Sequence, residues 1–224
     1  MSTHEHDEAQ FKPLAFNKKD ESSMRETAAS LANALATRRS VRAFSQEPIP
    51  LEVVRDAIRA ASQSPSGANK QPWTFALVTN PEIKQKIREA AEQEERAFYE
   101  ERAPQRWLDD LKPFGTNADK PHLTDAPALI MVFAQIHGEQ NKAQHYYVKE
   151  SVGLATGVLI AALHLSGLAT LTHTPSPMNF LQEVLDRPKH ERAFLLLPVG
   201  YPAPDCKVPD IERKPLDEVL VEYR

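Results

Sequence analysis

The spacing of apolar residues predicts helices and strands that alternate along the chain. Apolar positions three or four residues apart predict a helix that begins at Ser23 and ends in the cluster 38–42, and another over residues 51–62. Further helices are predicted over 146–168, which is rich in small residues, and over 180–185. A further helix is expected to begin at Asn80-Pro81, an N-cap residue followed by proline at the first helical position. Compact apolar runs predict strands over 73–78, 126–134, 168–172 and 193–199, of which 126–134 and 193–199 are expected to be buried. This order predicts an α+β domain or a mixed three-layer α–β–α domain.

Two stretches depart from this pattern. Residues 1–22 are polar and charged, which predicts a disordered or extended tail and places the start of the folded domain at residue 23. Residues 93–120 combine dense charge with prolines and isolated apolar side chains, which predicts an insertion that covers a site. Within it, Glu95 and Tyr99 stand four residues apart and share one helix face. A solvated, charged helix is the alternative interpretation.

Composition and charge exclude several classes of function. The chain has 224 residues and a net charge of −4, with scattered basic residues, which argues against nucleic-acid binding. Its longest apolar run, 152–168, is interrupted by His164 and Ser166, so we expect no membrane span. Cys206 is the only cysteine and the N-terminus lacks a signal-peptide core, which predicts a cytoplasmic protein. The eight histidines lack metal-ligand spacing, and no G-x-G-x-x-G fingerprint is present.

The stretch Ser64–Trp73 joins a predicted helix to a predicted strand. Pro65 and Pro72 fix φ, and Gly67 permits a conformation that other residues resist. A rigid bend with exposed backbone N–H groups follows, and such groups can donate to a phosphate, a flavin ring or a substrate oxyanion. A plain connection between helix and strand is the alternative.

Three arginines cluster at the end of the first predicted helix, in Arg38-Arg39-Ser40-Val41-Arg42. Arginine side chains pair bidentately with phosphate oxygens, so the cluster is a candidate phosphate clamp. Cations at a helix C-terminus are also favourable without any ligand, and both interpretations stay open on local evidence.

These stretches, together with Leu196-Leu197-Pro198-Val199-Gly200-Tyr201-Pro202, resemble the FMN-dependent nitroreductase superfamily over about residues 37–217. Within it the chain is similar to the iodotyrosine deiodinase family. That second resemblance is carried by Glu94–Tyr99, Arg106-Trp107, Thr116-Asn117, Lys120 and the stretch 208–217. The resemblance implies a nitroreductase fold with a central mixed sheet, in an intertwined homodimer that exchanges C-terminal tails.

The resemblance also implies FMN as the cofactor, bound at the dimer interface. Ser66 and Gly67 contact the flavin from the other subunit, and no metal is expected. The remaining FMN-binding residues implied are Arg38, Arg39, Ser40, Val41, Arg42, Thr172, His173, Thr174 and Arg213. Relatives have a run of threonines where this chain has Thr172-His173-Thr174, and Thr174 is assigned as the donor to flavin N5 because it precedes Pro175.

The substrate implied is a halotyrosine. Glu95, Tyr99 and Lys120 bind its amino-acid part, and the Ala68 N–H donates to its phenolate, which stacks on the flavin. The activity implied is FMN-dependent reductive dehalogenation of mono- and diiodotyrosine and other halotyrosines to tyrosine plus halide. Thr174 and Ala68 are the catalytic residues, and Thr174 favours one-electron steps. Vertebrate members carry an N-terminal membrane anchor that this sequence lacks, which points to a soluble, bacterial version.

Two other functions remain open at this stage. A generic NAD(P)H-dependent nitroreductase or quinone reductase needs the flavin loops but not Glu95, Tyr99 or Lys120. A flavin- or halotyrosine-binding sensor would bind without turnover. Because the sequence holds no second cofactor domain, a separate NAD(P)H-dependent reductase is the expected electron donor.

Overall fold

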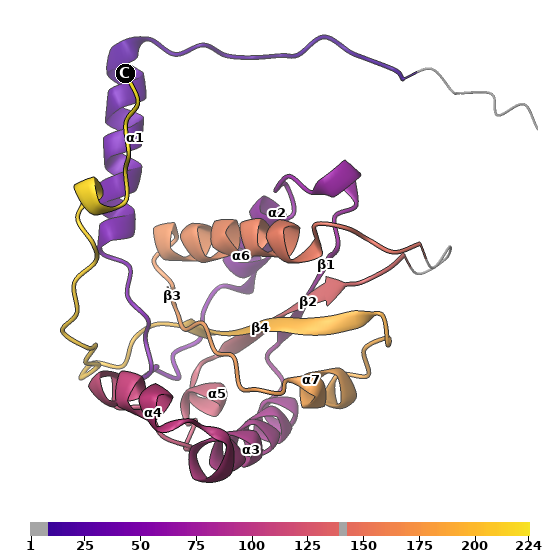
Figure 1. Ribbon diagram of the computed structural model, residues 1–224, viewed down its shortest axis with the longest axis vertical. Coiled ribbons are helices and arrows are strands. Elements are labelled where there is room, and N and C mark those ends of the chain that lie inside the picture. Colours follow the sequence, from indigo (N-terminus) through magenta and orange to yellow (C-terminus); the bar gives the residue numbers. More distant parts are fainter. Residues whose placement is uncertain (1–8, 139–142) are drawn as a thin grey trace, which may run out of the picture. The chain divides into compact units, whose positions relative to one another are not determined.

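The computed structural model describes residues 9–138 and 143–224 (Figure 1). The chain divides into two compact units, Met1–Thr37 and Arg38–Arg224. Residues 9–20 are exposed and form neither helix nor strand, while part of the predicted tail, residues 1–8, lies outside the described residues. The disorder predicted for this tail and the domain start predicted at residue 23 stay predictions.

The first unit contains helix α1, Glu21–Ala36. It begins before the predicted Ser23 because Asp20 is the N-cap, and its Oδ1 accepts the Ser23 backbone N–H at 3.0 Å. No residue of α1 is buried, and its apolar Met24 and Leu31 are exposed.

The second unit is built on a four-stranded sheet with the order β1-β2-β4-β3. The strands are β1 Trp73–Val78, β2 Ala128–Gln135, β3 Ala169–Thr170 and β4 Glu191–Gly200. All pairings between these strands are antiparallel, whereas a mixed sheet was expected. The parallel component is one bridge between Ser40 and Thr170, where the Val41 N–H donates to the Thr170 carbonyl at 3.1 Å. The chain passes beside β3 there for too short a length to form a strand.

Helices cover both faces of the sheet, which confirms the three-layer α–β–α architecture (Figure 1). One face carries α2 Leu51–Ala61 and α6 Val148–Leu165. The other carries α3 Pro81–Ala97, α5 His122–Asp125 and α7 Asn179–Val184. The central strand β2 is buried on both faces along almost its whole length, as its unbroken apolar sequence predicts.

Short helical segments complete the second unit. They are the 3₁₀ turn Gly67–Asn69, the π-helical turn Phe98–Arg102, α4 Gln105–Leu111, and the 3₁₀ turns Lys112–Phe114 and Leu216–Glu218. Most of them lie in the 93–120 segment or beside it. Residues 93–97 of that segment continue α3 rather than starting a separate element.

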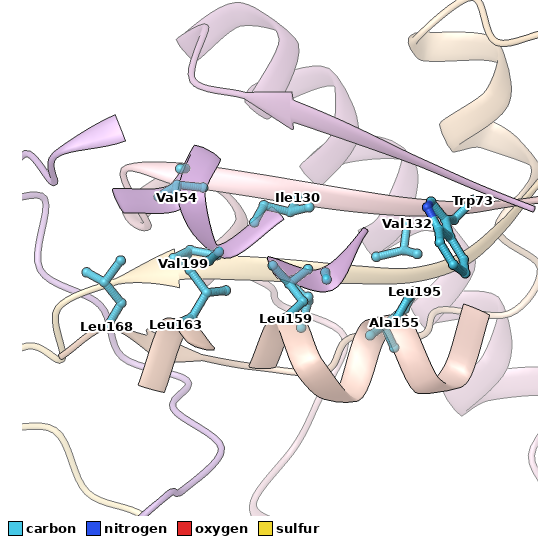
Figure 2. Packing of buried hydrophobic residues seen from close by; sticks show 14 of the residues in the cluster. Val54, Trp73, Ile130, Val132, Ala155, Leu159, Leu163, Leu168, Leu195 and Val199 are labelled. Atoms are coloured by element: carbon cyan, nitrogen blue, oxygen red, sulfur yellow. The ribbon is translucent and has the colours of Figure 1, made fainter. Parts of the chain in front are cut away.

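The core between α6 and the sheet is shown in Figure 2. Ala155, Leu159 and Leu163 point from α6 toward the strands, where they pack in one cluster with Val132 and Val199. Burying each large apolar side chain of this kind stabilises the fold by about 1.5–3 kcal/mol. Among the described helices, α6 alone is long and apolar enough to cross a membrane, but this packing makes it a core helix.

Local sequence signals predict some helix and strand boundaries correctly and others incorrectly. Strand β1 has the predicted bounds, and Asn80 caps α3 by accepting the N–H groups of Glu82 and Ile83. Helix α6 is shorter than predicted because Tyr147 and Gly167 have φ values of 53° and 82°, which lie outside the right-handed helical region. Side-chain periodicity does not report such backbone conformations.

Gly200, at the end of β4, offers a test of this packing. A Cβ built there would lie 2.6 Å from Pro127 Cδ and 3.3 Å from Phe44 Cδ1. We therefore expect Gly200→Ala to lower the free energy of unfolding by about 1–3 kcal/mol, measured by urea denaturation. Combining it with Pro127→Ala, which removes the ring atoms that the methyl group meets, should recover part of this loss. Equal stability of Gly200→Ala and the unchanged protein would show that the site is looser than described.

Candidate active site

A cavity of about 550 Å³ opens between the 93–120 segment and the loop that follows β3. Its walls come from the end of α3 and the π-helical turn after it, from residues 115–122, and from residues 171–176. Glu95, Tyr99, Lys120 and the loop Thr172–Thr174 all line it, as does Arg42. Residues that are distant in sequence, and that the sequence analysis assigned to one site, therefore meet at one cavity.

Glu95 and Lys120 form an ion pair in this cavity. Lys120 Nζ lies 3.1 Å from Glu95 Oε2, and the two side chains are only 6% and 13% exposed. Lys120 Nζ also donates to the Asn117 carbonyl and lies 5.6 Å from the centre of the Tyr99 ring. Buried charges that lose their partner are strongly unfavourable, so any ligand that separates the pair must supply a partner to each side.

The π-helical turn places Tyr99 beside this pair. Turns of this type widen a helix locally and are frequent at functional sites. Tyr99 donates its hydroxyl hydrogen to Thr116 Oγ1 at 2.9 Å, which ties the turn to the far end of the 93–120 segment. Phe98 packs edge-on against Trp107, with ring centroids 5.1 Å apart, and closes the outer wall. Residues of the 93–120 segment thus line much of this cavity, and its role as an insertion that covers a site stays a prediction.

A second cavity, of about 150 Å³, is lined by Arg38, Arg39, Ser40 and Arg42 of the candidate phosphate clamp, together with Arg213, Glu212 and Phe114. Burial lowers the pKa of the Arg38 guanidinium, and the charges of Arg213 and Arg39 lower it further. Within residues 9–138 and 143–224, no carboxylate forms a salt bridge with Arg38, Arg39 or Arg42. This concentration of like charge fits an anionic group such as the phosphate of FMN.

Arg42 and Val41, two residues of the cluster 38–42, differ in their surroundings. Arg42 lines both cavities, and its guanidinium carbon lies 5.9 Å from the centre of the Phe114 ring. The Val41 side chain is 6% exposed and packs in the core, and its N–H donates to the Thr170 carbonyl.

The loop after β3 is held by the backbone of its middle residue. The His173 N–H donates to the Leu196 carbonyl at 2.8 Å, and the Leu196 N–H donates to the His173 carbonyl at 3.0 Å. These bonds fix Thr172 and Thr174 on either side, and both line the larger cavity. The hydroxyl of Thr174 is therefore carried by a segment anchored to the central sheet.

His173 packs against His122, a residue that the sequence analysis did not single out. Their ring centroids are 5.2 Å apart in an edge-to-face arrangement, and each side chain buries an Nε2 that has no hydrogen-bond partner within the described part of the chain. Burial, with neighbouring positive charge, lowers the pKa of His122 to about 4 and that of His173 to about 3. Both rings are neutral at physiological pH, so His173 is no general acid there. His122 lies two residues after Lys120, and nothing in its local pattern distinguished it.

The loop Ser66–Ala68 lies outside both cavities. In the stretch Ser64–Trp73, positive φ values occur at Ala68, Asn69 and Gln71, at 45°, 54° and 48°. The special conformation expected at Gly67 is not found there. Gly67 is needed for space instead, because a Cβ there would lie 3.0 Å from the Tyr147 ring. The N–H groups of Asn69, Lys70 and Gln71 donate within the loop, while that of Ala68 has no acceptor in the described residues.

The histidine pair predicts a dependence of stability on pH. As pH falls below 6.5, unfolded His122 and His173 take up protons while the folded forms do not until about pH 4 and 3. Their contribution to stability is therefore complete above pH 6.5 and is lost as pH falls, by about 1.4 kcal/mol per pH unit for each group. His122→Phe should flatten the decline between pH 6.5 and 5 in urea denaturation and leave the trend above pH 7 unchanged. Parallel curves for the two proteins throughout would refute this origin.

Comparisons with known proteins identify the group to which the chain is related. The nitroreductase family matches residues 35–201. An iodotyrosine deiodinase from Haliscomenobacter hydrossis is 56% identical over 191 residues, 83% of this chain and 85% of that protein. Iodotyrosine deiodinase 1 from Mus musculus is 45% identical over 213 residues, 93% of this chain and 75% of that protein. A crystal structure of oxidized iodotyrosine deiodinase bound to FMN and 3-iodo-L-tyrosine matches with a TM-score of 0.74 and 34% identity, over 87% of this chain and 98% of that one. The chain therefore belongs to the nitroreductase family and, within it, to the iodotyrosine deiodinases.

Proposed function

We propose that this chain is an FMN-dependent iodotyrosine deiodinase, which converts mono- and diiodotyrosine to tyrosine and iodide and accepts other halotyrosines. The observation that carries this proposal is the buried Glu95–Lys120 pair with Tyr99 beside it, in a cavity next to a cluster of arginines. The identity to iodotyrosine deiodinases, and the likeness to a solved structure with FMN and iodotyrosine, support the same activity.

The ion pair explains how a free amino acid is recognised. Its ammonium group can pair with Glu95, and its carboxylate can pair with Lys120 and accept from Tyr99. One buried ion pair is then replaced by two, and neither protein charge is left without a partner. A ligand with only one of the two charges leaves Glu95 or Lys120 unpaired. The site therefore selects the zwitterion, and covering the cavity excludes water from it.

FMN, when bound, supplies the electrons that reduce the carbon–halogen bond. Arg38, Arg39, Arg42 and Arg213, with Ser40, line the smaller cavity and would hold its phosphate and ribityl chain. The Thr172–Thr174 loop would lie along the flavin ring, with the Thr174 hydroxyl donating to N5 to favour one-electron steps. The Ala68 N–H would donate to the phenolate oxygen and keep the substrate ionised over the ring.

Ser66, Gly67 and Ala68 reach this site only if a second copy of the chain provides them. Apolar surface for such a homodimer is available on α6, where Leu154, Val158 and Leu165 are exposed. The C-terminal segment also exposes Leu216, Val219, Leu220, Val221 and Tyr223, which is consistent with a tail that is exchanged between copies. A separate NAD(P)H-dependent reductase as electron donor, and a cytoplasmic location, complete the proposal.

Activity and its dependence on Glu95 can be measured together. Protein reduced with dithionite should release iodide from diiodotyrosine and yield tyrosine. Glu95→Gln should weaken iodotyrosine binding by about 100-fold while FMN content stays unchanged, because the ligand's ammonium loses its buried partner. Glu100→Gln, an exposed position on the next turn, is the matched control. Rapid NADPH oxidation by nitroaromatics without iodide release would favour a generic nitroreductase instead.

The homodimer is tested by placing a charge on the exposed face of α6. Val158 is 40% exposed, so Val158→Arg should leave the chain folded but lower the sedimentation coefficient to that of a monomer and cause loss of FMN. Gln85→Arg adds the same charge on the exposed surface of α3 and should change neither property. A Val158→Arg protein that remains dimeric and retains FMN would place the interface elsewhere.

A further inference from the structure

Three polar residues follow one another at intervals of four along α3: Lys84, Arg88 and Glu92. This spacing puts them on one helix face. The face turns toward the segment Lys120–Ala126, which contains α5, and all three side chains are largely withdrawn from solvent. Lys84 is 8% exposed, and the side chains of Arg88 and Glu92 are 28% and 15% exposed. Charged residues on a buried face need partners, and here the partners lie in the Lys120–Ala126 segment and on the face itself, where Arg88 pairs with Glu92.

The three side chains hold that segment from end to end. Lys84 Nζ donates to the carbonyls of Thr124 at 2.9 Å and Ala126 at 2.7 Å. Arg88 donates to Thr124 Oγ1 at 2.9 Å, and its Nε donates to Glu92 Oε1 at 2.7 Å. The same Glu92 oxygen accepts the backbone N–H of Lys120 at 2.8 Å.

Lys120 is therefore held at both ends by carboxylates one turn apart on the same helix. Glu92 binds its backbone N–H, and Glu95 binds its Nζ at 3.1 Å. Burial raises the pKa of Glu92, but the hydrogen bonds from Lys120 and Arg88 outweigh it and leave that pKa below its ordinary value. Glu92 is thus ionised at neutral pH, and Arg88 balances its charge.

Binding of a zwitterionic ligand changes the partner of only one of the two carboxylates. Glu95 must exchange Lys120 for the ligand's ammonium, whereas the bond from Glu92 to the Lys120 backbone can persist. A lysine side chain has a flexible four-carbon stem, so the place that its ammonium group reaches depends on where its backbone is held. Anchoring the Lys120 backbone fixes the point from which the stem extends, so the ammonium group stays near the place where the carboxylate arrives.

We infer that Glu92, held by Arg88, is a positioning residue for substrate selection: it fixes Lys120 so that its ammonium meets the carboxylate of the amino-acid ligand. The inference rests on the proposed function, in which Lys120 binds that carboxylate. Glu92 acts on the amino-acid part of the ligand only, through Lys120, and contributes nothing to the recognition of the phenol.

The experiment compares two ligands on FMN-loaded protein by quenching of the bound flavin's fluorescence. One is 3-iodotyrosine and the other is 2-iodophenol, which lacks the amino-acid part. Glu92→Met removes the acceptor and should raise the Kd of 3-iodotyrosine about tenfold, because a buried N–H loses a charged partner. The Kd of 2-iodophenol should stay within about twofold, since it makes no contact with Lys120. Glu92→Gln keeps an acceptor oxygen and should fall between Glu92→Met and the unchanged protein.

Glu89→Met on the exposed face of α3 is the matched control and should alter neither Kd. Equal weakening of both ligands in Glu92→Met would mean a purely structural residue and overturn the inference, as would an unchanged Kd for 3-iodotyrosine. If Glu92→Met does not fold, the milder Glu92→Gln is judged by the same split between ligands. Unchanged protein that binds 2-iodophenol but not 3-iodotyrosine would refute the proposed function itself, and this inference with it.

Discussion

The buried ion pair between Glu95 and Lys120 is the interaction on which the site depends. Two charges withdrawn from water at 6% and 13% exposure are tolerable only while each has a partner. A ligand can enter between them only if it brings one charge of each sign. In the proposed function, this condition selects a free amino acid before any contact with the aromatic ring is considered. The binding energy of the amino-acid part would then help to hold the phenolate over the flavin.

The rest of the fold holds this ion pair and the arginine clamp in fixed positions relative to each other. Strand β2 is buried on both faces, and β4 beside it anchors the loop that carries Thr172 and Thr174. On the opposite wall of the larger cavity, α3 supplies Glu95. Its side chains Lys84, Arg88 and Glu92 also form hydrogen bonds with the Lys120–Ala126 segment. Arg42 lines both cavities. Its positive charge therefore belongs to the phosphate clamp and also to the wall of the cavity that holds Glu95 and Lys120. Rigid elements therefore fix these charges, and Phe98 and Trp107 of the 93–120 segment line the cavity beside them.

Sequence reasoning succeeded where the determining physics is local. The bounds of β1 follow from its apolar run, and Asn80 caps α3 as its side chain and the following proline predict. The family resemblance brought Glu95, Tyr99 and Lys120 together, and one cavity unites them. The sequence could not reveal that Gly67 is required by the approach of Tyr147, nor that His122 meets His173, because both depend on segments distant in the chain. In the sequence Glu92 is one of many charged residues, and only the structure shows its contact with the Lys120 backbone.

The most direct test of the account is to remove the two charges of the ligand one at a time. Binding of 3-iodotyrosine, its N-acetyl derivative and its methyl ester to the FMN-loaded protein can be followed by flavin fluorescence. The first derivative lacks the positive charge and leaves Glu95 without its partner, while the second lacks the carboxylate and leaves Lys120 without one. Both should bind at least about tenfold more weakly than 3-iodotyrosine, because each leaves a buried charge unpaired. Binding of either derivative within about twofold of 3-iodotyrosine would contradict the account.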